Sequence, residues 1–161
     1  MKKILNSIMI IMFLLGASNY LLGQTFVGSQ ECSGCHTEKY DDWIVSGHPY
    51  KFNVIENNEP PTYPPFVTNF EDSWMGGLGD GTQTWEDIAG VIGGFGWKAR
   101  FVGKDGHLVG TAGSAYSTGL GHNQINFYGG ENHGWKDYHP GDVKIYNYSC
   151  FKCHTTGGDT K

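Results

Sequence analysis

The sequence predicts a mostly irregular fold, in which short α-helices and a small β-hairpin or sheet lie between two copies of one cysteine–histidine motif. Three observations support this prediction. All four cysteines fall in Cys-x-x-Cys-His units, at residues 32–36 and 150–154. Glycine is abundant, and only 25 of the 138 residues from position 24 onward are Val, Ile, Leu or Phe, so little aliphatic surface is available for a core. Turn signals divide the part between the motifs into short segments.

The first 23 residues predict a signal peptide. Lys2 and Lys3 precede an apolar run from Ile8 to Leu15, which is too short to span a bilayer comfortably. We therefore expect a periplasmic or exported protein with no membrane span after cleavage, and residues 24–161 are expected to form a single domain. Sixteen acidic and nine basic residues then remain, a formal charge of −7 that argues against nucleic acid as a partner.

The segment after the first motif predicts a short amphipathic helix. Tyr40, Trp43 and Ile44 fall on one helical face, and Gly47 is a plausible end. Prolines and glycines then predict irregular structure over residues 51–83.

The second half of the chain predicts one more helix and a few strands. Thr84 with Asp87 resembles a capping box that would open a helix over residues 85–92. Asp105-Gly106 predicts a hairpin turn between strands at 96–102 and 107–111. A further strand is expected at 124–128, followed by an aromatic-rich loop over 129–149.

Cys-x-x-Cys-His is the spacing typical of covalent c-type haem attachment. In each motif the two thiols would form thioether bonds to the haem vinyl groups, and the next residue would supply the proximal imidazole. The residues that would hold two haems in this way are Cys32, Cys35, His36, Cys150, Cys153 and His154. Because aliphatic residues are few, we also expect the two haems to form part of the core.

Three other uses of the cysteines compete with haem attachment. A zinc site could use all four sulfurs but would leave the two following histidines unexplained. A thioredoxin-like dithiol expects one Cys-x-x-Cys in a βαβ context, which the sequence lacks. Disulfides would close only two-residue loops within each motif and would gain little stability.

Distal iron ligands must come from a small set of side chains. His48, which follows the first predicted helix, and His139, eleven residues before Cys150, are the preferred candidates. His133 competes with His139, whereas His107 and His122 are expected at the surface. The remaining candidates would be Met75 or no distal ligand. Two bis-histidine irons would suit electron transfer better than substrate binding.

The sequence resembles a family of extracytoplasmic multihaem c-type cytochromes. The shared strings are Gly28-Ser-x-x-Cys-x-x-Cys-His36, Trp43-x-x-Ser-Gly-His48, Ile92-Gly-Gly-x-Gly-Trp-Lys-Ala-Arg-Phe101 and Cys150-x-x-Cys-His-Thr-Thr-Gly157. The resemblance implies a multihaem cytochrome c-like fold, with His36 and His154 as proximal ligands and His48 as a distal one. Members of the family usually continue with further motifs, so the chain is expected to be a short dihaem or truncated member.

The expected function is electron transfer between redox partner proteins, such as other cytochromes, through two c-type haems. Two alternatives stay open. A five-coordinate iron could reduce peroxide or a nitrogen or sulfur oxyanion, which would make the protein an enzyme. Alternatively, the chain could be an assembly subunit that stacks haems and shares haem ligands within an oligomer.

Overall fold

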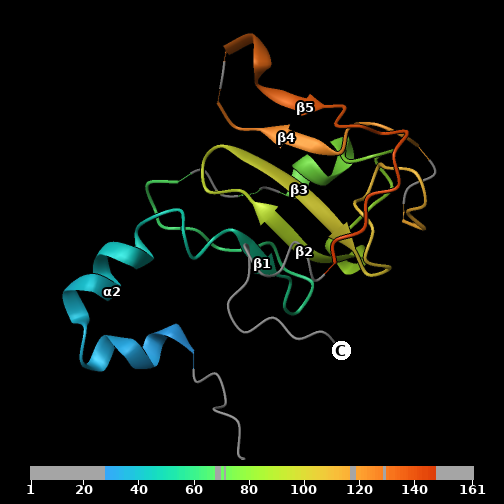
Figure 1. Ribbon diagram of the computed structural model, residues 1–161. Coiled ribbons are helices and arrows are strands. Elements are labelled where there is room, and N and C mark those ends of the chain that lie inside the picture. Colours follow the sequence, from blue (N-terminus) through green and yellow to red (C-terminus); the bar gives the residue numbers. More distant parts are fainter. Residues whose placement is uncertain (1–27, 68–69, 71, 117–118, 129, 148–161) are drawn as a thin grey trace, which may run out of the picture.

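The computed structural model describes residues 28–67, 70, 72–116, 119–128 and 130–147. Its main element is one five-stranded antiparallel sheet, in which the strands lie side by side in chain order (Figure 1). The strands are β1 (Phe52–Val54), β2 (Ile88–Gly93), β3 (Lys98–Gly103), β4 (Gln124–Asn126) and β5 (Gly134–Lys136). The helix α2 (Thr37–Ile44) lies to one side of the sheet, and 3₁₀ turns span Ser29–Gly34, Asp72–Gly77, Trp85–Asp87 and Gly130–Asn132.

One face of the sheet packs on an aromatic core. Val91 is paired with Phe101 across β2 and β3, and both side chains are buried. The ring of Phe101 contacts those of Phe70, Trp85 and Trp135, with centroids 5.6 to 6.0 Å apart. Such large rings bury much apolar area per residue, so a chain with few aliphatic residues still forms a core of its own. The expectation that haems form part of the core stays a prediction.

The opposite face of the sheet carries an aromatic residue on β1 and polar residues on β3, β4 and β5. The strand register places one row of residues across it, namely Phe52, Ile92, Arg100, Gln124 and Lys136. The ring of Phe52 lies over Gly90, where an added Cβ would come within 2.3 Å of the ring. Tyr146 stacks on the outer side of Phe52, with centroids 4.5 Å apart. This contact brings the chain just before the second motif onto the sheet.

The predicted fold class was wrong. The described chain is organised by an antiparallel sheet, not by irregular structure and short helices as in a multihaem cytochrome c-like fold. The physical reason is a consistent apolar face: Ala99 and Phe101 alternate with Lys98 and Arg100 along β3, a period of two that buries one side of a strand.

The helix predicted over residues 85–92 was also wrong. The capping box is present, because the Asp87 carboxylate accepts hydrogen bonds from the backbone N–H and hydroxyl of Thr84. It opens only the 3₁₀ turn Trp85–Asp87, after which the chain enters β2. Ile88, Val91 and Ile92 are β-branched, and their preference for a strand outweighs the helical spacing of their side chains.

Other elements agree with the sequence in part. The helix after the first motif is confirmed but ends at Ile44, before Gly47. The hairpin turn is confirmed by the hydrogen bond from the backbone N–H of Gly103 to the carbonyl of His107 (2.8 Å), although residues 107–111 form only single bridges rather than a strand. A strand occurs within 124–128, whereas β1 and β5 lie in segments that were expected to be irregular.

Candidate haem-attachment site

The first motif forms a tight surface turn at the start of α2. The carbonyl of Cys32 accepts hydrogen bonds from the backbone N–H groups of Cys35 (3.3 Å) and His36 (3.0 Å). His36 is the N-cap residue of α2, so its side chain leaves the backbone where the helix begins. The turn therefore holds two thiols and one imidazole within five residues.

All three of these side chains are exposed. Cys32 and Cys35 are free thiols, and no disulfide joins them. No residue of the sheet core belongs to this segment, and α2 contacts mainly the preceding 3₁₀ turn. These features fit a covalently attached haem, since both thiols are open to thioether formation and the imidazole beside them is not engaged in the core.

His48 lies on a turn that is fixed to the sheet. The hydroxyl of Tyr50 donates to the carbonyl of Ile44 (3.1 Å), and the Tyr50 ring stacks on Phe95 at 5.1 Å. Gly47 packs against the same Phe95 ring, where an added Cβ would come within 3.3 Å. The His48 side chain is exposed. An anchored turn thus presents an imidazole at the surface between α2 and the β2–β3 hairpin, as a distal ligand would require.

His139 is also exposed, but it has partners. Its Nδ1 lies 3.7 Å from a carboxylate oxygen of Asp142, and its ring packs edge-on against Tyr138 at 4.6 Å. Of the other histidines, His122 and His133 are exposed, whereas His107 is partly buried beside Asp105. The exposure of His122 agrees with the surface position expected for it, and the exposure of His133 leaves it open as a ligand. His107 is less accessible than expected.

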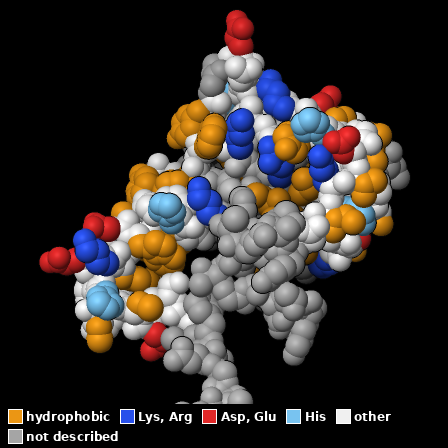
Figure 2. Space-filling view, in the orientation of Figure 1, with side chains coloured by type: hydrophobic (Ala, Val, Ile, Leu, Met, Phe, Trp, Pro, Cys, Tyr) orange, Lys and Arg blue, Asp and Glu red, His pale blue; other side chains and the backbone are white. Residues whose placement is uncertain are grey.

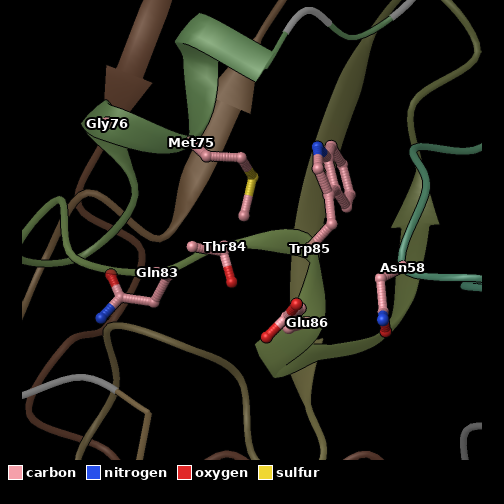
Figure 3. Close-up of a pocket in the computed structure, with 7 residues that line it drawn as sticks. All are labelled: Asn58, Met75, Gly76, Gln83, Thr84, Trp85 and Glu86. Atoms are coloured by element: carbon pink, nitrogen blue, oxygen red, sulfur yellow. The ribbon is translucent and has the colours of Figure 1, made fainter.

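Met75 is a core residue. Its side chain is only 5% exposed and reaches toward Thr84 across a pocket of about 560 Å³ (Figure 3). The described residues that line this pocket are Asn58, Met75, Gly76, Gln83, Thr84, Trp85 and Glu86. They include no histidine or cysteine. The only methionine outside the predicted leader is therefore buried in the core, beside a pocket that no described histidine or cysteine lines.

The second motif falls outside the described residues, as do residues 1–23 of the predicted signal peptide. Cys150, Cys153 and His154 therefore remain predictions. The chain just before the second motif is described, and there Tyr146 packs on Phe52 of β1. Four residues from Tyr146 to Cys150 can extend at most about 14 Å.

One feature of this region was missed from the sequence. Arg100 donates from Nε (2.9 Å) and Nη2 (2.6 Å) to the side-chain carbonyl of Gln124, and its guanidinium lies 3.6 Å from the centre of the Tyr138 ring. The alternation of Lys98, Ala99, Arg100 and Phe101 could have placed the two cations on one face. Sequence alone could not bring Tyr138 beside Arg100.

Two further findings concern the described part of the chain. No three His, Cys, Asp or Glu side chains there gather in a group that could hold a bare metal ion. None of the helices in these residues is long and apolar enough to cross a membrane. Comparisons of the chain with known protein families, with curated proteins and with solved structures found no match.

Proposed function

We propose that this protein transfers electrons through two covalently bound c-type haems. Cys32, Cys35 and His36 would hold the first haem. Cys150, Cys153 and His154 would hold the second. The observation that carries the proposal is the exposed turn of the first motif, which sets two free thiols beside an imidazole in the order that haem attachment needs. When bound, each haem supplies a one-electron iron couple, and the chain supplies ligands and surroundings.

The path of the chain supports a relay between two haems. Tyr146, four residues before Cys150, stacks on Phe52, which starts the edge strand β1. The same strand follows the anchored turn of His48, which in turn follows α2 and the first motif. Both motifs therefore connect to one edge of the sheet, an arrangement that favours short distances between their cofactors.

The proposal also covers where the protein acts and which proteins it meets. The resemblance to extracytoplasmic multihaem cytochromes, the predicted leader and the acidic balance of the chain favour an exported carrier that meets other redox proteins. His48 is the preferred distal ligand for one iron, and His139 for the other.

The haem content and spin state of the exported protein test this function. Its intact mass should exceed that of the cleaved polypeptide by two haems, and electron paramagnetic resonance of the oxidised form should show low-spin iron alone. A bare chain with free thiols or disulfides would refute the proposal. A high-spin fraction that binds cyanide or nitrite would instead favour the enzyme, and ligands shared between subunits would favour the assembly unit.

The role of His48 is tested by replacing it. His48→Asn should convert one of the two haems from low to high spin, because asparagine offers no imidazole to the iron. The matched control is His122→Asn, which removes another exposed histidine and suits the left-handed backbone there (φ 43°). If both variants keep the wild-type spectrum, His48 is not an iron ligand.

A further inference from the structure

Arg100 is a half-buried cation with no acidic partner in the part of the chain that the structure describes. The ion pairs found there involve His107, His139 and Lys144, with Asp105 and Asp142 as their carboxylates. Arg100 instead binds a neutral amide oxygen and stacks on a ring. Asp137, the carboxylate nearest to Tyr138 in sequence, accepts a hydrogen bond from the backbone N–H of His122.

In this arrangement the guanidinium of Arg100 is preorganised to bind an anion. Gln124 and Tyr138 fix the plane of the guanidinium, while its remaining N–H groups are not used by Gln124. Burial lowers the pKa of Arg100 from its ordinary value, which shows that removal from water disfavours the charge. A carboxylate bound to the guanidinium would offset that penalty through charge-assisted hydrogen bonds.

Two lysines share this face of the sheet. Lys98 lies two residues before Arg100 on β3, and Lys136 follows in the same cross-strand row, beyond Gln124. Figure 2 shows Lys and Arg side chains gathered over the part of the sheet formed by β3 to β5. Such a cluster is unexpected in a chain with a formal charge of −5, and it fits a ligand with more than one carboxylate.

The segment that carries the second motif begins on this same face. Phe52 and Arg100 belong to one row and are two strands apart, about 10 Å. Tyr146 sits on Phe52, and Cys150 can lie up to about 14 Å beyond it. His139, the preferred distal ligand for the second haem, packs against the Tyr138 ring that covers Arg100.

We propose that Arg100, with Lys98 and Lys136 beside it, binds the propionate carboxylates of the haem attached at Cys150 and Cys153. This inference rests on the proposed function. A haem combines a broad apolar plane with two carboxylates, and the face combines an aromatic side at Phe52 and Tyr146 with a basic side at Arg100. The haem carried by Cys150 and Cys153 would be the occupant of this face.

The reduction potential of the second haem tests the assignment. Arg100→Gln should leave both haems attached, as intact mass will show, and should make one haem harder to reduce, by up to about tenfold in its equilibrium constant. That change corresponds to about 59 mV for a one-electron couple. The cause is that the propionate charge, no longer neutralised, favours the ferric state. Arg100→Lys should restore part of the wild-type potential because it keeps the charge.

Two comparisons make the result specific. Lys104→Gln removes the same charge from an exposed turn beyond β3 and should change neither potential. In a variant with Cys150→Ala and Cys153→Ala, which retains the first haem alone, Arg100→Gln should have no effect. Equal shifts in Arg100→Gln and Lys104→Gln, or a shift of the first haem, would overturn the assignment. A wild-type chain that lacks the second haem would refute the proposed function itself.

Discussion

Replacing Phe101 by alanine is expected to lower the free energy of unfolding by about 3–5 kcal/mol. Phe101 is 1% exposed in the middle of β3, and its ring contacts three other rings of the core. Truncation removes the buried area of the Phe101 ring and the contacts that it makes with the three neighbouring rings. Those rings cannot fully close the resulting cavity. Since domains are typically stable by about 5–15 kcal/mol, this loss would leave the sheet marginal or unfolded. Denaturant titration followed by circular dichroism measures it.

The matched control is Phe66→Ala, the same chemical change at a residue that is 63% exposed. Its one described ring contact is with Phe95, with centroids 6.0 Å apart. We expect a loss of about 1 kcal/mol or less, because little area returns to water. Similar losses in the two variants would mean that Phe101 does not lie at the centre of the core.

Local signals in the sequence predicted the structure more reliably than the composition and the two motifs predicted the fold class. The Thr84–Asp87 box, the turn at Asp105-Gly106 and the helix after the first motif all occur, because each depends on residues within a few positions. Tertiary packing decides which element of secondary structure follows such a local signal. The capping box opens a single 3₁₀ turn, since Val91 gains more by facing Phe101 across the sheet than by continuing a helix.

The short strands were missed for a related reason. β1 and β5 have three residues each, too few for a period of two to stand out among glycines and prolines. They form because β2 and β4 offer them unpaired edges. For the candidate site, spacing indicated the first motif, and the position just after the predicted helix indicated His48. The structure places both on exposed turns. The stack of Tyr138 on Arg100 joins residues 38 positions apart, and no local pattern indicates it.

Removing the first pair of thiols is expected to separate haem binding from folding. Cys32→Ala with Cys35→Ala should lose one of two covalent haems, halving the haem absorbance per chain, because no thioether can then form. The free energy of unfolding of the sheet should change by no more than about 0.5 kcal/mol. The reason is structural: the motif and α2 contribute no residue to the core, and both cysteines are exposed. Intact mass and denaturant titration measure the two effects on one sample.

The paired variant, Cys150→Ala with Cys153→Ala, should also lose one haem, the result expected if each motif attaches its haem independently. The effect of the first pair of substitutions on unfolding also distinguishes two views of the core. If loss of the first haem abolishes cooperative unfolding, that haem is part of the core, as the shortage of aliphatic residues suggested. If unfolding is unchanged, the aromatic cluster around Phe70 and Phe101 is sufficient for the sheet. The first haem is then a surface cofactor, held by a turn of five residues and open to redox partners.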